Sequence, residues 1–211
     1  MTRFTTFIVA ASLALFAGAT PSLAQSSNQI EEALKPKVDP NKPVTRSLSG
    51  TRSIANDPKA AAERQILDRA RTRAISVESV QPAAKEEREQ IAEIVKDKPK
   101  IDLEIYFDYN SDLIGPKAIV AVNALGEALV KPGLKDGTFV LNGHTDAAGS
   151  PEYNLALSHR RAQSVRRYLI ETYKIAPDAL LVAGFGKERL KFTDKPLADQ
   201  NRRVEVVNAT Q

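Results

Sequence analysis

Residues 143–169 have the sequence GHTDAAGSPEYNLALSHRRAQSVRRYL, and this stretch contains the signals that decide the fold of the 211-residue chain. Ser150 and Pro151 mark a helix start, because a serine side chain caps free N–H groups and proline fits the first turn. Apolar residues then recur at helical spacing to about residue 173. The stretch therefore predicts a tight turn followed by a long helix.

Strand and helix patterns continue on both sides of this stretch. Residues 101–108, IDLEIYFD, alternate between apolar and polar side chains, which indicates a half-buried strand. A proline begins, and a Pro-Gly pair ends, a predicted helix over about residues 116–130. The order β-α-β-α-β-β predicts an α+β domain over residues 101–211, which is large enough to bury its own core. The remaining predicted strands lie at residues 137–143, 180–184 and 202–207.

The first 24 residues are typical of a secretory signal peptide. Arg3 supplies a positive charge, and an apolar stretch follows from Phe7 to Ala19. This stretch is too short to span a bilayer in the usual way, where about 20 residues are needed. We expect cleavage after Ala24, and an uncleaved membrane anchor is the alternative.

Residues 25–100 have a different composition. Up to residue 57 they are rich in proline and serine and poor in large apolar residues, which predicts a flexible linker. Residues 58–97 are rich in alanine, glutamate and arginine, so solvated spacer helices with narrow apolar stripes are expected. These helices are also a candidate docking surface for an envelope protein partner. We expect no transmembrane span in the mature chain, because no other apolar run approaches the required length.

Charge and cysteine content exclude several partners and chemistries. The chain has a net charge of +4, but residues 101–211 contain as many acidic as basic residues. A nucleic-acid-binding domain normally concentrates positive charge on itself, so no nucleic acid is expected as a partner. The chain has no cysteine, which excludes disulfides and thiol catalysis. A secreted chain without disulfides fits a bacterial envelope compartment.

Metal-binding and catalytic residue types occur in the opening stretch, but their pattern argues against both functions. His144, Asp146 and His159 could form a facial metal-binding triad. Two arginines directly follow His159, however, and disfavour a cation there. We expect His144 to be partly buried and His159 to be exposed. Ser158 lies beside His159 without a GxSxG motif, so we expect no catalytic residues, no metal and no cofactor.

Asp146 and Arg161 indicate a third possibility, a site for a ligand that carries both charges. Asp146 lies in a loop before a helix N-terminus, and Arg161 lies about three turns into that helix with a planar group suited to a carboxylate. Alternatively, Asp146 caps its own turn and Arg161 bridges to it or to another surface acid, which contributes little to stability. The residues alone leave both interpretations open.

The same stretch resembles the core motif of the OmpA-like peptidoglycan-binding domain, GHTDxxGxxxYNxxLSxxRAxxVxxYL. Upstream, YFDYNSDLIGPKA is similar to the family's first-strand motif, and downstream GFGKERL and NRRVEV resemble its last two strand motifs. The resemblance covers about residues 101–208 in the right order and spacing. Residues 187–200 depart from the family pattern, so the resemblance does not predict their conformation.

The resemblance implies an α+β fold with helices packed on one small mixed sheet, and a non-catalytic domain that binds the diaminopimelate of a peptidoglycan stem peptide. Asp146 would accept from the distal ammonium group, and Arg161 would bind the carboxylate beside it. We expect Arg202 and Arg203 to brace the sheet by pairing with buried acids. The implied pocket is lined and shaped by Phe107, Asp108, Asn110, Thr145, Asn154 and Leu157.

Together, these features predict a periplasmic protein that is held non-covalently at the peptidoglycan, near the outer membrane, through residues 101–211. The alternative is an envelope adaptor, in which residues 25–100 bind a protein partner and the C-terminal domain only localises it.

Overall fold

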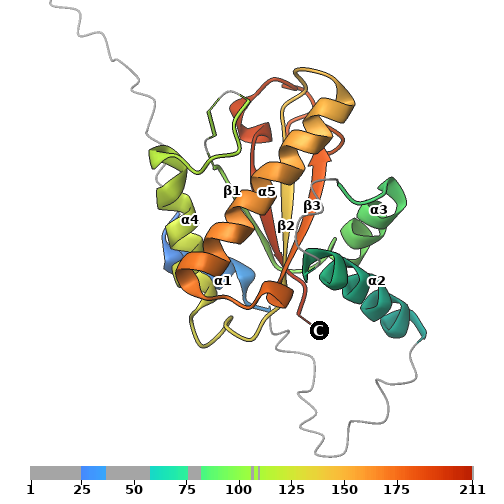
Figure 1. The fold of residues 1–211 in the computed structure, drawn as a ribbon, viewed down its shortest axis with the longest axis vertical. Coiled ribbons are helices and arrows are strands. Elements are labelled where there is room, and N and C mark those ends of the chain that lie inside the picture. The colour runs from blue at the N-terminus through green and yellow to red at the C-terminus, as the bar shows by residue number, and fades with distance from the viewer. Residues whose placement is uncertain (1–24, 37–57, 76–81, 106, 109, 211) are drawn as a thin grey trace, which may run out of the picture.

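The computed structural model describes residues 25–36, 58–75, 82–105, 107–108 and 110–210 (Figure 1). The expected signal peptide and residues 37–57 of the expected linker lie outside these described residues. In the described part of the chain, every helix is too short or too polar to cross a membrane.

The centre of the fold is a four-stranded mixed sheet. Its strands are β1 (Lys100–Leu103), β2 (Phe139–His144), β3 (Leu180–Gly186) and β4 (Val204–Asn208). They lie in the order β1-β4-β2-β3. β4 pairs antiparallel with β1 and β2, whereas β2 and β3 are parallel. All residues of β2 are buried, so both faces of the sheet are covered at its middle.

Two helices cover one face of the sheet at the predicted positions. α4 spans Pro116–Leu129 and α5 spans Pro151–Tyr173, so the predicted order of elements is confirmed. Ser150 caps α5 as expected, since its side chain accepts a hydrogen bond from the N–H of Tyr153 at 3.2 Å. α5 crosses the front of the sheet in Figure 1. The core side chains that both helices bury here include Val122, Leu125, Val165 and Leu169.

α5 lies close to β2 and β3 because both strands have glycine where the helix crosses them. A Cβ atom on Gly143 would come within 2.1 Å of the carbonyl oxygen of Ser158. One on Gly184 would lie 2.8 Å from the backbone nitrogen of His159. The buried hydroxyl of Ser158 also accepts a hydrogen bond from the N–H of Gly186 at 2.8 Å. These contacts fix the depth at which α5 lies on the sheet.

The first described segment differs from the flexible linker expected over residues 25–57. Ser27–Leu34 form the helix α1, which Ser26 caps. Ile30 and Leu34 are fully buried in the main core, where α1 packs against α4 and β1. The linker prediction was wrong here because two apolar residues four positions apart form a stripe on one helix face, even in a polar sequence.

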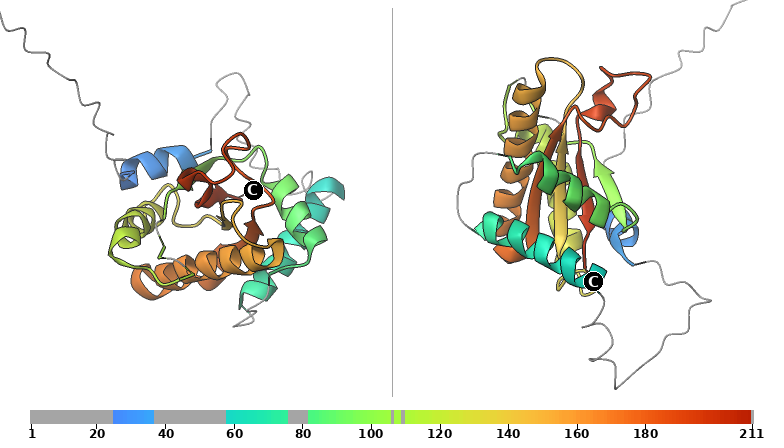
Figure 2. Two further views of the ribbon diagram at one scale, coloured as in Figure 1. Left: turned by 90° about the horizontal axis from the view of Figure 1, so that it is seen from above. Right: turned by 90° about the vertical axis from the view of Figure 1, so that its right-hand side faces the viewer.

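The expected spacer helices form, but they are not solvated on all sides. α2 spans Pro58–Ile75 and α3 spans Lys85–Ile94. Leu67 of α2 and Ile91 of α3 belong to a second apolar cluster, together with Val140 of β2. Seen from above, α2 and α3 lie on the opposite side of the sheet from α1 and α4 (Figure 2). The prediction of helices outside the core was wrong because their narrow apolar stripes meet apolar side chains of the sheet.

Two arginines attach these helices to the rest of the fold. Nε of Arg71 on α2 donates to the carbonyl oxygen of Asp178 at 3.1 Å, just before β3. Arg88 on α3 is buried, and one of its Nη atoms lies 3.0 Å from both carboxylate oxygens of Glu188. The described parts of residues 25–100 therefore pack as one body with residues 101–210.

Replacing Gly143 with alanine should destabilise the fold, because the new Cβ atom would force α5 away from β2. We expect the free energy of unfolding to fall by about 1–3 kcal/mol, the usual cost of overpacking. Gly115→Ala is the control, since a Cβ atom there meets nothing within 4 Å. Its cost at the start of α4 should stay below about 1 kcal/mol. Chemical denaturation measures both, and equal losses would contradict this description of α5.

Ile91→Ala tests whether α3 belongs to the core. Ile91 is 1% exposed, so its truncation should lower the free energy of unfolding by about 2–5 kcal/mol. Gln90→Ala, at the exposed neighbouring position, should change it by less than about 0.5 kcal/mol. The same denaturation experiment compares the two variants. If Ile91→Ala lowers the free energy of unfolding as little as Gln90→Ala does, α3 is a solvated spacer helix after all.

Candidate functional site

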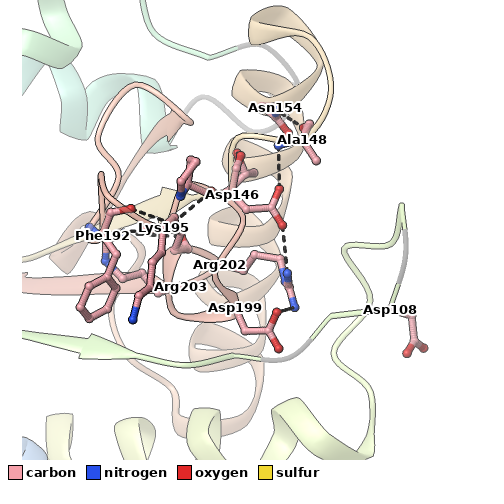
Figure 3. Close-up of polar contacts among 12 residues, drawn as sticks. Asp108, Asp146, Ala148, Asn154, Phe192, Lys195, Asp199, Arg202 and Arg203 are labelled. Carbon is pink, nitrogen blue, oxygen red and sulfur yellow. Dashed lines mark hydrogen bonds and ion pairs between the residues drawn. The ribbon is translucent and has the colours of Figure 1, made fainter.

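Asp146 lies in the turn between β2 and α5, and each of its two carboxylate oxygens contacts a different group. Oδ1 accepts a hydrogen bond from the N–H of Ala148 at 3.1 Å. Oδ2 lies 2.9 Å from Nη1 of Arg202, whose Nη2 lies 2.6 Å from Asp199. Figure 3 shows the carboxylate of Asp146 between Ala148 and Arg202, with Asp199 beyond. Asp146 thus caps its own turn, but the arginine that it contacts is Arg202.

Side chains from three directions hold the backbone of this turn. Nζ of Lys187, at the end of β3, donates to the carbonyl oxygens on either side of Ala148, at 3.4 and 2.7 Å. Asn154 on α5 donates to the carbonyl oxygen of Ala148 at 2.6 Å. The N–H of Ala147 donates to the carbonyl oxygen of Pro196 at 2.9 Å. Lys187 and Pro196 belong to the segment whose conformation the sequence did not predict.

Arg161 lies on the inner side of α5, about three turns from the Asp146 turn. Its Cζ atom lies 5.0 Å from the centre of the Phe107 ring, which is within the range of a cation–π interaction. Nε donates to the carbonyl oxygen of Ser111 at 3.1 Å, and Nη2 donates to that of Asp108 at 3.3 Å. The loop between β1 and α4 therefore holds the guanidinium through its backbone and one aromatic ring.

Arg161 differs from the other strongly buried arginines of the described chain in what it contacts. Arg88 contacts the carboxylate of Glu188, and Arg203 contacts that of Asp102 at 2.9 Å. Within the described residues, the hydrogen bonds of Arg161 go to neutral carbonyl groups alone. Burial lowers the pKa of Arg161, because less water solvates its charge. A buried cation of this kind is stabilised when an anionic group binds to it.

The two neighbouring arginines before β4 have different roles. Arg203 braces the sheet as expected, since it pairs with Asp102 on β1. Burial opposes ionisation of Asp102, but Lys191 and Arg203 outweigh it and hold the pKa of this carboxyl below its ordinary value. Arg202 was also expected to brace the sheet, and instead it contacts Asp146. The signal was present in the sequence, because neighbouring side chains of an extended segment point to opposite sides.

Three of the implied pocket residues lie around the Asp146 turn. The buried hydroxyl of Thr145 donates to the carbonyl oxygen of Asp146 at 2.9 Å. Asn154 is buried and holds Ala148, as described above. Leu157 is buried about one turn further along α5. These residues position the turn and the start of the helix.

The other three residues of the implied pocket lie on the loop between β1 and α4. Phe107 and the backbone of Asp108 contact Arg161, whereas the side chain of Asp108 is exposed and points away from Asp146 (Figure 3). Asn110 has a positive φ of 52° and accepts a hydrogen bond from the hydroxyl of Tyr153 at 2.8 Å. This bond ties the loop to the first turn of α5, and so to the Asp146 turn.

Both histidines are buried, so the expectation of an exposed His159 was wrong. Gly184 leaves room for His159 beneath α5. The ring of His144 stacks on Phe185, with 5.6 Å between ring centres. Burial, reinforced by the positive charge of Arg203, lowers the pKa of His144 to about 3. Among the residues described, no three His, Asp or Glu side chains form a group that could hold a metal ion.

Comparison with known proteins finds similarity over the part of the chain that contains this site. Residues 106–203 match the model of the OmpA family. The peptidoglycan-associated lipoprotein of Pseudomonas aeruginosa is 41% identical over 103 residues, which are 48% of this chain and 59% of that protein. Outer membrane protein A of Escherichia coli O157:H7 is 38% identical over 84 residues, 40% of this chain and 24% of that protein. The chain thus spans less than two thirds of either relative.

Among solved structures, the chain is similar to the periplasmic domain of Helicobacter pylori MotB. It is 21% identical and has a TM-score of 0.47, with 55% of this chain and 76% of that chain covered. The family match begins after β1, so α1, α2 and α3 lie outside it.

The buried His144 predicts a loss of stability in acid. On unfolding, the imidazole regains its ordinary pKa of about 6.5 and takes up a proton that the folded state excludes until about pH 3. The contribution of the neutral ring is therefore complete above pH 6.5 and decreases as the pH falls towards 3. The decrease approaches about 1.4 kcal/mol per pH unit.

His144→Phe keeps an aromatic ring beside Phe185 but cannot be protonated. The free energy of unfolding of this variant should fall less between pH 6.5 and pH 5 than that of the wild type. Denaturation curves at the two pH values measure the difference. If wild type and variant differ in free energy of unfolding by the same amount at both pH values, burial of His144 does not cause the loss of stability in acid.

Proposed function

We propose that the chain binds peptidoglycan non-covalently, without breaking any bond, through the domain that contains residues 106–203, which match the OmpA family. In this proposal, Asp146 and Arg161 hold the diaminopimelate of the stem peptide. The match to a protein named peptidoglycan-associated lipoprotein supports the polymer as the ligand. The finer assignment to diaminopimelate depends on the chemistry of the two side chains.

The contacts of Arg161 carry the proposal. This buried guanidinium is held by two neutral carbonyl groups and an aromatic ring, and it has more N–H donors than those two bonds use. A ligand carboxylate would supply the charge that Glu188 supplies to Arg88 and that Asp102 supplies to Arg203. An Arg–carboxylate contact can be bidentate, which would also orient the ligand.

Asp146 supplies the acceptor for the ligand's ammonium group. This carboxylate would be shared between Arg202 and the ammonium, while Asp199 continues to neutralise Arg202. The charges of Asp146, Asp199, Arg161 and Arg202 sum to zero. A zwitterionic centre therefore adds no net charge when it enters, whereas a purely cationic or anionic group would leave one sign in excess.

This arrangement predicts selectivity between stem peptides. Diaminopimelate ends in a centre that carries both an ammonium and a carboxylate, whereas lysine ends in the ammonium alone. A lysine-type stem would satisfy Asp146 and leave Arg161 without its carboxylate. A missing partner for a buried polar group costs about 1–3 kcal/mol, or roughly 5- to 150-fold in affinity.

Diaminopimelate-type peptidoglycan would place the protein in the periplasm, at the cell wall and near the outer membrane. The names of the two relatives, a peptidoglycan-associated lipoprotein and an outer membrane protein, agree with this location. An adaptor role through α2 and α3 would have to use their polar surface, because Leu67 and Ile91 are buried against the sheet.

Asp146→Asn and Arg161→Ala should each lower binding to diaminopimelate-type sacculi by at least about tenfold, since each removes one half of the charge recognition. Asp146→Asn keeps an acceptor for the N–H of Ala148, so the turn should survive. Co-sedimentation with purified sacculi measures binding, and thermal unfolding reports whether each variant is folded.

Arg167→Ala is the matched control, because it removes an exposed arginine from the same helix. It should sediment like the wild type. If both site variants also sediment like the wild type, the assignment of Asp146 and Arg161 is wrong.

A further inference from the structure

The segment that joins β3 to β4 reaches the Asp146 turn at two points. The carbonyl oxygen of Pro196 accepts the N–H of Ala147 at 2.9 Å. Further along, Asp199 and Asp146 both contact Arg202. Figure 3 shows Phe192, Lys195 and Asp199 of this segment on the same side of the site as Arg202. The segment therefore acts as a support for the turn.

One buried side chain organises this segment from within. Asn201 has no exposed surface, and its Oδ1 accepts the N–H groups of Lys191 and Phe192, both at 2.9 Å. Its Nδ2 donates to the carbonyl oxygens of Lys195 at 3.0 Å and Pro196 at 3.2 Å. The amide thus uses both its acceptor and its donors to close residues 191–196 into a fixed loop.

Asn201 is directly connected to both groups of this segment that contact the Asp146 turn, the carbonyl of Pro196 and the side chain of Arg202. The carbonyl oxygen of Pro196 accepts hydrogen bonds from both Asn201 and Ala147. Arg202, which contacts Asp146, is the next residue in the chain. A shift of the loop would therefore move the Asp146 turn and Arg202 together.

We propose that Asn201 is a positioning residue of the ligand site, which acts through Pro196 and Arg202 to set where the carboxylate of Asp146 lies. Asn201 itself is buried and does not touch the ligand. This inference rests on the proposed binding of diaminopimelate by Asp146. It gives residues 187–200 a role in the site, although they depart from the family pattern.

Asn201→Ala should weaken binding of a soluble muropeptide with a diaminopimelate stem by about tenfold, because small errors in the placement of binding groups are costly. It should also accelerate hydrogen exchange at the N–H of Ala147, whose acceptor Pro196 would no longer be held. Calorimetric titration measures the first effect and NMR exchange the second. Asn201→Asp keeps an oxygen that accepts the N–H groups of Lys191 and Phe192 but loses the donors to Lys195 and Pro196. Its effects should therefore lie between those of wild type and Asn201→Ala.

Asn208→Ala is a matched control at the opposite end of β4. Asn208 is also buried, and its amide donates to the carbonyl oxygen of Leu34 at 2.9 Å and accepts the N–H of Thr210 at 2.9 Å. Its replacement should lower the melting temperature about as much as Asn201→Ala, while affinity stays within about twofold of wild type. This comparison separates loss of positioning from loss of stability.

Two results would overturn the proposal. The first is that Asn201→Ala, measured below the melting temperature of the variant, has the same affinity and the same Ala147 exchange rate as wild type. If Asn201→Ala does not fold, the same criterion applies to Asn201→Asp. The other is an equal loss of affinity in Asn208→Ala. If the wild type does not bind the muropeptide, the proposed function fails instead, and the Ala147 exchange rate alone decides whether Asn201 positions the turn.

Discussion

The close contact between α5 and the glycines of β2 and β3 is the constraint on which the rest of the structure depends. Asp146 leaves the end of β2, and Arg161 projects from α5, so their relation is set by how deeply the helix lies on the sheet. A Cβ atom on Gly143 would meet the backbone of Ser158. The hydrogen bond from the N–H of Gly186 to the Ser158 hydroxyl fixes the same contact along the helix axis. Packing in the core therefore determines the relative positions of the Asp146 and Arg161 side chains.

The helices that precede the region matching the OmpA family complete this fold. α2 and α3 cover the face of the sheet opposite α5, and α1 extends the core beside α4. Deleting residues 25–98 would therefore expose apolar sheet surface, and it would not leave an intact binding domain for comparison. Partner binding through these helices is better tested by changing exposed polar residues than by removing the segment.

The sequence was sufficient for the elements with strong local signals. Ser150 and Pro151 placed the start of α5, and the motif around Asp146 and Arg161 indicated the two residues that we propose as ligand-binding. The packing of α2 and α3 was missed because their apolar stripes are narrow. A signal existed in the sheet, since the neighbouring pairs Val140-Leu141 in β2 and Leu180-Leu181 in β3 are buried on both faces.

The supporting residues of the site could not be predicted in the same way. Arg202, Lys187 and Asn201 act on residues more than 30 positions away in the chain, or on backbone groups whose positions follow only from the tertiary fold. Their residue types are compatible with many surface roles. Their contacts with the Asp146 turn, direct for Lys187 and Arg202 and through Pro196 for Asn201, follow from the tertiary fold.

The claim that Asp146 and Arg161 bind the two charges of diaminopimelate is tested most directly by NMR titration of the wild-type protein with two soluble stem peptides. With the diaminopimelate peptide, we expect the largest shifts at Nε–H of Arg161 and at the N–H of Ala148, which donates to Asp146. With the lysine peptide, the Arg161 signal should stay in place. Equal shifts of Arg161 with both peptides, or shifts confined to the far end of the sheet near Lys98 and Asn208, would contradict it.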